Sequence, residues 1–345
     1  MVEDVGCDKR KYKDDFGDSA LTYLPDDLIF SHLRDEDPQI QVGPLESVHW
    51  IQVVPINGGF NMFHMKNTSE DKYIEVDGKR LHYLEWGVWS WTTMLLLHGI
   101  GDDAHVWDHF ALDAADQFRI IALDQRGHGL SDWVTPPAYS CRDYVSDIEN
   151  LVEALQLKKI ILIGHSMGAL HATRYASQIP GKTAALIHAA IDPCPPEWNK
   201  KYLTNLYKRL PEFYTSVREY VEELRQNSPY AEESLLYRLA AFALTECENG
   251  KLRLRYDREV LRHFDHYDLR PYLKDIRCPV LIMRGQESRV MSAEVAREMS
   301  AMINQGRFTE IPKAAHPLHT DNPLEFQRVV MAFLDELCQS GLTGI

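Results

Sequence analysis

The stretch GHSMG (164–168) places one serine between two glycines, and this spacing indicates nucleophilic chemistry. An apolar run precedes it and small apolar residues follow, which predicts a strand that turns directly into a helix at Ser166. Such a turn strains the backbone of its central residue and exposes that side chain. A β-carbon at Gly164 or Gly168 would clash with the neighbouring elements. We therefore predict that Ser166 is a nucleophile at the positive end of a helix dipole.

A serine hydroxyl needs a base, and 15 histidines are available. His316 is distinguished by its position, because IPKAAHPLHTDNP follows the last apolar run and precedes the last amphipathic one. A loop there would lie at the carboxyl edge of a parallel sheet, where ligands bind. We predict that His316 is the base and that His319 lies in the pocket or its loop.

Acyl transfer also requires donors for the negative charge that develops on a carbonyl oxygen. The stretch LHGIG (97–101) ends an apolar run, and its glycines leave backbone N–H groups free to point into a site. We predict the N–H groups of Ile100 and Met167 as the two donors. His98 and Gly99 are predicted to border the same pocket.

The elements that must hold these residues are read from hydrophobic periodicity. Strands are expected at 47–55, 94–99, 118–124, 158–164, 183–192, 279–285 and 306–312, and helices at 140–156, 167–177 and 323–338. Two β-prone runs flank Asp77-Gly78, which predicts a hairpin. Continuous apolar strands that alternate with amphipathic helices predict an α/β fold, with a mostly parallel sheet covered on both faces.

Between 194 and 275 the pattern changes to helical spacing, with no apolar run of strand type. We interpret this block as a helical insertion over one end of the sheet. The predicted division is an N-terminal extension at 1–71, a core at 72–193 and 276–345, and a helical cap at 194–275. Trp107, His165 and Trp198 are predicted to line the substrate pocket together with the residues above.

Composition limits the possible partners. Hydrophobic residues make up 45% and charged residues 26%, with a formal net charge of −14. This acidity argues against nucleic acid and anionic membranes, which call for a basic surface. Six cysteines are scattered without a C-x-x-C pair, and neither an N-terminal apolar run nor a membrane-length run occurs. We expect free thiols, no metal and a cytoplasmic protein that binds a small molecule; the oligomeric state stays open.

Over about residues 72–340 the chain resembles serine hydrolases of the α/β-hydrolase superfamily. The resemblance rests on HG (98–99), DQRGHGLSD (124–132), GHSMG (164–168) and AAHPLHTDNP (314–323), in that order. It implies an eight-stranded α/β-hydrolase sheet with a helical cap, and chemistry without a cofactor. Related dehalogenases and epoxide hydrolases have an aspartate where this chain has Ser166, so the resemblance implies neither activity. DQRGHG is interpreted as structural, with Asp124 and Arg126 tying loops together.

The resemblance is broken at the acid of the triad. The family commonly has an acid three residues after the glycine that ends PVLIMRG, and here Ser288 stands there with Glu287 adjacent. Some relatives take the acid from the end of the preceding core strand, which is Asp192 in this chain. We predict Asp192 as the acid, with Glu287 as the alternative. Both keep the order serine, acid, histidine along the chain.

These residues predict hydrolysis of a carboxylic ester or related acyl bond through an acyl-enzyme, on a small and hydrophobic substrate. Three other uses of the same residues are carbon–carbon bond hydrolysis, lactone opening and cofactor-free oxygenation. A hydrolase-like receptor with low turnover is an alternative of a different class.

Overall fold

The computed structural model describes residues 69–87, 92–195, 197–264 and 267–340, and three short strands nearer the N-terminus. For residues 197–200 it describes the backbone alone. The chain divides into two compact units, Met1–Thr68 and Ser69–Ile345. Most of the predicted extension at 1–71 lies outside the described residues.

The first unit contains a three-stranded antiparallel sheet. Its strands are β1 (Thr22–Leu24), β2 (Ile51–Ile56) and β3 (Gly59–His64), and they pair in this order. The strand expected at 47–55 overlaps β2.

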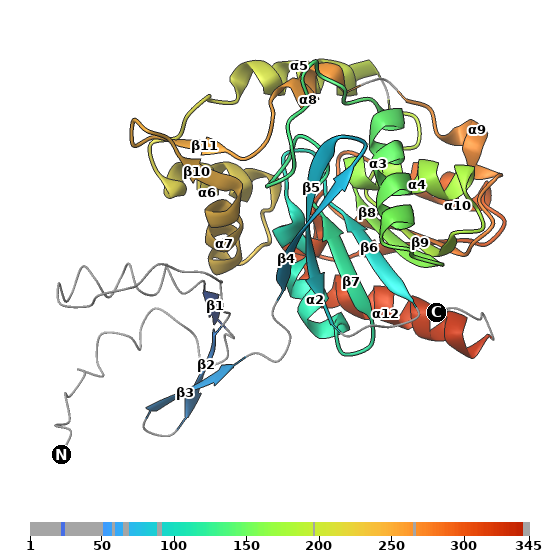
Figure 1. Ribbon diagram of the computed structural model, residues 1–345. Helices are drawn as coiled ribbons and strands as arrows, with labels where there is room; N and C mark the ends of the chain where they lie inside the picture. Colours follow the sequence, from blue (N-terminus) through green and yellow to red (C-terminus); the bar gives the residue numbers. More distant parts are fainter. Residues whose placement is uncertain are drawn as a thin grey trace. The chain divides into compact units, whose positions relative to one another are not determined.

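The second unit is built on an eight-stranded sheet of the order β13-β12-β9-β8-β6-β7-β5-β4 (Figure 1). The strands are β4 (Glu70–Val76), β5 (Lys79–Trp86), β6 (Thr93–Leu97), β7 (Arg119–Leu123), β8 (Ile160–His165), β9 (Thr183–Ala189), β12 (Val280–Gly285) and β13 (Gly306–Ile311). All pairs from β13 to β7 are parallel, and β5 and β4 are antiparallel. The predicted fold class is confirmed.

The predicted hairpin joins β4 and β5. Asp77 and Gly78 have φ angles of 50° and 71°, as the two central residues of a type I′ turn require. An aspartate tolerates this left-handed conformation better than most residues, and glycine adopts it without a steric penalty. Asp77-Gly78 therefore sets the register of the hairpin at the edge of the sheet.

Helices cover both faces of the sheet, because the strands are apolar on both sides. The helices of the core are α2 (Asp108–Ala114), α3 (Cys141–Ala154), α4 (Met167–Gln178), α10 (Ala293–Ala301), α11 (Leu318–Asp321) and α12 (Pro323–Gln339). Leu95 and Leu97 of β6 belong to one hydrophobic cluster with residues of α3, α4 and α10. Met94 and Leu96 alternate with them, are fully buried, and lie outside that cluster. The other face is the one on which α2 and α12 contact each other.

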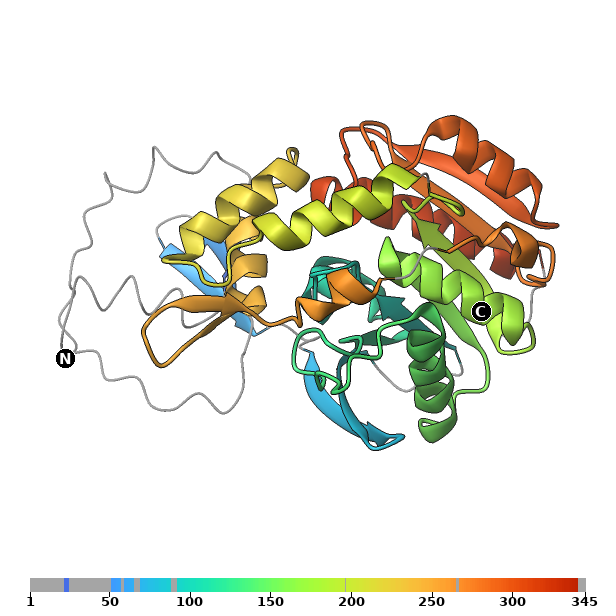
Figure 2. The ribbon, with the colours of Figure 1, turned by 90° about the horizontal axis from the view of Figure 1, so that it is seen from above.

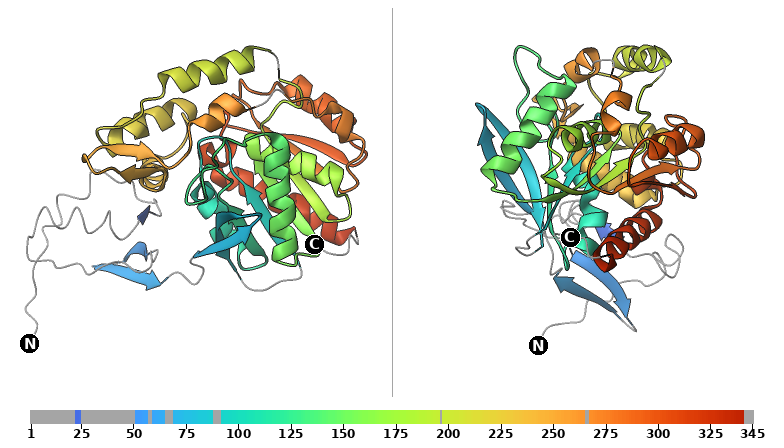
Figure 3. Two further views of the ribbon diagram at one scale, coloured as in Figure 1. Left: turned by 45° about the horizontal axis from the view of Figure 1, so that its top comes forward. Right: turned by 90° about the vertical axis from the view of Figure 1, so that its right-hand side faces the viewer.

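The segment between β9 and β12 is mainly helical, and we call it the helical segment. It contains α5 (Glu197–Arg209), α6 (Val217–Asn227), α7 (Glu233–Ala243), α8 (Glu259–His263) and α9 (Arg270–Leu273). Figures 1 and 2 show α5 and α8 over one end of the sheet, and Figure 3 shows α6 and α7 beside it. A short hairpin, β10 (Leu244–Glu246) with β11 (Leu252–Leu254), was not expected from the sequence.

The helical segment has its own hydrophobic cluster, which includes Tyr220, Leu236 and Tyr256. Ile100 of the core packs against this cluster. Tyr139 of the core donates a 2.6 Å hydrogen bond to the carboxylate of Asp257. These contacts join the helical segment to the loops that follow β6 and β7.

Candidate active site

The nucleophile turn has the strained geometry that the sequence predicts. Ser166 lies between β8 and α4 with φ 50° and ψ −119°, a region that residues with a β-carbon rarely adopt. A β-carbon at Gly164 would overlap the backbone of Gly168, and one at Gly168 would overlap the carbonyl of Leu97. The Ser166 N–H donates a 2.9 Å hydrogen bond to the Ala189 carbonyl of β9. Close packing on both sides therefore holds the serine in this conformation.

His316 reaches the serine from the loop after β13. Its Nε2 lies 2.9 Å from Ser166 Oγ, within hydrogen-bond distance. Nε2 accepts the hydroxyl proton in the tautomer that carries its own proton on Nδ1. Burial lowers the pKa of His316 to about 3; the neighbouring ring of His165 acts in the same direction and Asp102 in the opposite one. The imidazole is therefore neutral at pH 7, as a base that removes the serine proton must be.

Neither predicted carboxylate contacts the second nitrogen of this ring. His316 Nδ1 is buried and has no hydrogen-bond partner among the described residues. Asp192 is 8% exposed, and its Oδ1 accepts a 2.8 Å hydrogen bond from the Cys194 N–H. Glu287 is exposed and lines the cavity, and its N–H donates to the Ala314 carbonyl. The structure thus brings Ser166 and His316 together, but neither of the two predicted carboxylates joins them.

The two predicted oxyanion donors come from two different elements. Met167 is the first residue of α4, and Ile100 follows β6 at the edge where the helical segment packs. Both line the same cavity as Ser166 and His316. The first turn of α4 also has N–H groups that no earlier helical carbonyl accepts, which favours a negative charge at this position.

Sequence reasoning missed Asp102, the aspartate that follows Gly101 in the loop after β6. Its Oδ2 lies 3.8 Å from His165 Nδ1. Burial raises the pKa of Asp102, but His165, His98 and His319 together lower it by more, so the net shift is downward. A β-carbon at Gly99 would come within 2.8 Å of Asp102 Oδ2 and 2.9 Å of His165 Nδ1. The close approach of Asp102 to His165 therefore depends on the glycine at position 99. The sequence feature that could have revealed Asp102 was an aspartate in the short loop after His98-Gly99.

The serine opens into a cavity of about 880 Å³ between the core and the helical segment. Gly99, Ile100, His165, Met167 and His316 line it, as predicted from the sequence. The helical segment contributes apolar and aromatic residues to the lining, among them Leu203, Leu206, Leu210, Tyr220, Leu224, Leu239, Leu254, Tyr256 and Phe264.

Three predicted pocket residues lie behind the cavity wall instead. His98 is fully buried, and its ring accepts a hydrogen bond from the Gln125 N–H. Trp107 is also fully buried and stacks on the ring of His319, with centroids 4.6 Å apart. The side chains of all three pack into the core instead of facing the cavity. The side chain of the fourth, Trp198, lies outside the described residues.

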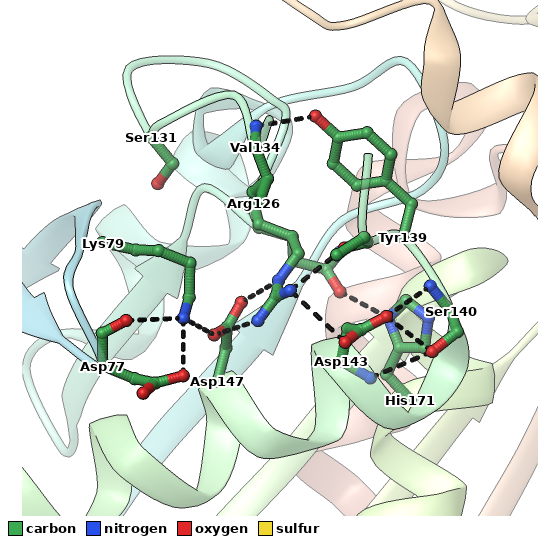
Figure 4. Close-up of polar contacts among 12 residues, drawn as sticks. Asp77, Lys79, Arg126, Ser131, Val134, Tyr139, Ser140, Asp143, Asp147 and His171 are labelled. Carbon is green, nitrogen blue, oxygen red and sulfur yellow. Dashed lines mark hydrogen bonds and ion pairs between the residues drawn. The ribbon is translucent and has the colours of Figure 1, made fainter. Parts of the chain in front are cut away.

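The DQRGHG stretch ties loops together, as the sequence suggested. Arg126 donates two hydrogen bonds of 2.5 Å to the buried carboxylate of Asp147 on α3, and one of 3.0 Å to the Ala138 carbonyl (Figure 4). Asp124 accepts hydrogen bonds from the Ala104 N–H and from the ring of His82. These contacts hold the loop after β7 against its neighbours and give no group to the cavity.

The sequence led us to expect neither a membrane span nor a bound metal, and two properties of the structure concern these expectations. Among the described residues, no helix combines the length and the apolar character that a membrane span requires. No group of three or more His, Cys, Asp or Glu side chains in that part of the chain is arranged to hold a metal ion.

Comparison with known proteins identifies similar enzymes. The chain is 28% identical to 2-(acetamidomethylene)succinate hydrolase of Mesorhizobium japonicum over 250 residues, which are 70% of this chain and 87% of that protein. It is 25% identical to epoxide hydrolase 1 of Caenorhabditis elegans, over 77% of this chain and 70% of that one. A bifunctional esterase/perhydrolase of Acinetobacter calcoaceticus is 24% identical, over 75% and 97% of the two chains.

The fold is also found in solved structures. That of E-2-(acetamidomethylene)succinate hydrolase matches with a TM-score of 0.71 and 25% identity, covering 78% of this chain and all of the other. A family model described as the alpha/beta hydrolase fold matches residues 92–323, which include Ser166 and His316. The chain is therefore a hydrolase and belongs to the alpha/beta hydrolase fold family.

Proposed function

We propose that the protein is a serine hydrolase that cleaves a carboxylic ester, or a related acyl bond, of a small substrate through an acyl-enzyme. The observation that carries this proposal is the 2.9 Å contact between His316 Nε2 and Ser166 Oγ, at a strained turn in the wall of a cavity. A neutral imidazole within hydrogen-bond distance of a serine is the arrangement that general-base activation requires.

In the proposed reaction, Ser166 Oγ attacks the carbonyl carbon while His316 Nε2 takes the hydroxyl proton. The negative charge on the carbonyl oxygen is held by the N–H groups of Ile100 and Met167. The bond between the carbonyl carbon and the ester oxygen then breaks, and the alcohol leaves with the proton from His316. A water molecule attacks the acyl-enzyme with His316 as base again, which releases the carboxylic acid and restores the serine.

The proposed acid is Asp192, with Glu287 as the alternative. Asp192 follows β9, the strand next to the nucleophile strand, and its neighbour Ile191 lines the cavity. Burial raises the pKa of Asp192. A buried carboxylate gains more from a nearby imidazolium than an exposed one does, and Glu287 is exposed. We propose that Asp192 turns toward His316 Nδ1 when the imidazolium forms.

We propose that residues 194–275 act as a cap that selects the substrate, that residues 72–193 and 276–345 carry the chemistry, and that residues 1–71 are an extension. The apolar and aromatic lining from α5, α6 and α7 supports this division. Within the described part of the chain the cysteines Cys141, Cys194, Cys247, Cys278 and Cys338 are all free thiols, which supports a cytoplasmic location.

We propose ester cleavage and not epoxide opening, because the nucleophile of this chain is a serine. The related epoxide hydrolases have an aspartate at the corresponding position. The esterase/perhydrolase named above is consistent with an acyl substrate. A doubly anionic substrate, such as the succinate in the name of another relative, would meet three carboxylates and one guanidinium in the cavity lining, so the lining does not favour it.

The test combines covalent labelling with turnover. A fluorophosphonate should label the wild-type protein on Ser166, as mapped by mass spectrometry, and Ser166→Ala should abolish labelling. p-Nitrophenyl butyrate should be hydrolysed by the wild type and, in Ser166→Ala, at least about a thousandfold more slowly. Labelling without turnover of any ester would favour the receptor reading. Absence of labelling, with the protein folded, would overturn the serine mechanism.

A further inference from the structure

The charges that line the cavity are unequally distributed between its mouth and its interior. Four of the described lining residues are charged: Asp102, Glu223, Glu287 and Arg289. Glu287 and Arg289 are exposed residues two positions apart, so they bring opposite charges to the rim. Asp102 and Glu223 are partly buried, so the interior has two carboxylates and no lysine or arginine among its described lining.

Aromatic rings lie beside these two carboxylates. Tyr220 and Glu223 are three residues apart on α6, so they share one face of the helix. A β-carbon at Gly101, next to Asp102, would lie 3.6 Å from the ring of Tyr256. Burial raises the pKa of Tyr220 well above its usual range, and the negative charges of Asp102 and Glu223 raise it further. The two carboxylates and the two tyrosines therefore form one group, which we call the acidic-aromatic wall.

The carboxylate of Glu223 is held by a hydrogen bond, but its surroundings stabilise its negative charge only weakly. Its Oε2 accepts a 2.8 Å hydrogen bond from the Tyr214 hydroxyl. Burial nevertheless raises the pKa of Glu223, which means that its surroundings disfavour the carboxylate anion. A cation in the cavity would supply the missing charge, and a ring face attracts a cation as well. An anion would meet repulsion from both carboxylates.

We propose that the substrate carries a cationic amine or ammonium group, which binds against the acidic-aromatic wall formed by Asp102, Tyr220, Glu223 and Tyr256. This inference rests on the proposed ester hydrolysis at Ser166 and names the class of its substrate. The ester carbonyl lies at Ser166, and the apolar part of the substrate contacts the leucines of α5 and α7. Selectivity is then set by the charge of the ligand as well as by its size.

The experiment compares ligands of equal shape and different charge. Choline esters and 3,3-dimethylbutyl esters of one acid differ only in the replacement of nitrogen by carbon, so the cation is present or absent on the alcohol side. p-Nitrophenyl esters of 4-(trimethylammonio)butyric acid and 5,5-dimethylhexanoic acid make the same comparison on the acyl side. We expect kcat/KM at least about tenfold higher for the cationic member of one pair.

The wall is tested by Glu223→Gln, which keeps an oxygen that can accept the Tyr214 hydroxyl hydrogen bond. This change should reduce the cationic preference at least about threefold. Glu222→Gln is the matched control, because Glu222 is exposed on the same helix, outside the cavity lining, and should leave the preference unchanged. As a second measurement, choline should inhibit the wild type more strongly than 3,3-dimethylbutan-1-ol does. This difference between the two alcohols should be smaller in Glu223→Gln.

Equal turnover of both members in both pairs, with equal inhibition by the two alcohols, would overturn the cationic substrate. So would a preference that Glu223→Gln and Glu222→Gln alter alike. The neutral esters and the fluorophosphonate separate this result from a failure of the proposed reaction, because they report on Ser166 whatever the charge of the substrate.

Discussion

The ring of His165 and the backbone of His316 are in direct contact, since His165 Nε2 lies 3.1 Å from the His316 carbonyl oxygen. His165 immediately precedes Ser166, the proposed nucleophile, and His316 is the proposed base. One contact thus joins the turn that carries the serine to the loop that carries the histidine. Asp102 Oδ2 lies 3.8 Å from the other ring nitrogen of His165, Nδ1.

We predict that His165 is a positioning residue for the base. His165→Phe keeps a ring of similar size but removes the donor to the His316 carbonyl, so the loop loses its fixed distance from Ser166. We expect kcat to fall about ten- to a hundredfold with KM within about threefold, because small displacements of reacting groups have effects of this size.

The control is His165→Gln, whose amide can again donate a hydrogen bond and should recover part of the lost kcat. Thermal melting of both variants separates positioning from a loss of fold. Unchanged kcat in a folded His165→Phe protein would contradict this role.

The identity of the acid is predicted from the two carboxylates, each changed to its amide. Asp192→Asn keeps an oxygen to accept the Cys194 N–H, so the loop after β9 should stay in place. We expect kcat to fall by on the order of a thousandfold or more, because the imidazolium loses its charge partner and its orientation. Glu287→Gln should lose less than about tenfold.

Steady-state kinetics on a p-nitrophenyl ester measures both variants. The reverse ranking would assign the acid to Glu287. Near-full activity in both would mean that the base works without either carboxylate.

Much of the fold could be predicted because buried parallel strands have short, continuously apolar sequences. The strands β8 and β9 are of this kind, whereas the antiparallel β4–β5 hairpin was predicted from its Asp77-Gly78 turn. The β10–β11 hairpin could not, since each strand has three residues and part of its stability comes from contacts with Tyr214 of the helical segment. Strands this short lack a period that a sequence pattern can reveal.

The candidate site was predictable where a motif fixes the backbone, and less so where packing decides a side chain's direction. GHSMG fixes the turn, and therefore the place of Ser166. His98 belongs to the HG motif and Trp107 lies in the segment that follows it, yet both rings are fully buried in the core. Asp102 was missed for the converse reason, because only the folded chain brings it to the ring of His165.

The pH dependence of the reaction follows from the environment of His316. Its pKa of about 3 lies below the ordinary value near 6.5, so the folded protein keeps the imidazole neutral and active far below neutral pH. We therefore expect kcat/KM, which reports on the free enzyme, to lose activity only below about pH 5. Asp192→Asn should leave this limb in place, since Asp192 does not contact the ring in the free protein.

The measurement is a pH series with a neutral ester, over the range in which the fold is stable by circular dichroism. A limb near pH 6.5 or above would contradict the expectation, because it would mean that a carboxylate already pairs with Nδ1 before the substrate binds.

The last prediction concerns the ion pair between Arg126 and Asp147, whose side chains are 4% and 3% exposed. Arg126→Met leaves the Asp147 carboxylate buried without its main partner, so we expect the free energy of unfolding in urea to fall by about 3–5 kcal/mol. Arg126→Met combined with Asp147→Leu removes both charges and should recover most of this loss.

Burial already raises the pKa of Asp147, so the lone carboxylate of Arg126→Met should take up a proton as the pH falls, and its deficit should shrink. The surface pair of Arg307 and Glu336, 50% and 61% exposed, provides the control, because Arg307→Met should change stability by less than about 1 kcal/mol. A double variant no more stable than Arg126→Met would show that the loss comes from the packing of the arginine, including its contact with the Ala138 carbonyl, and not from an unpaired buried charge.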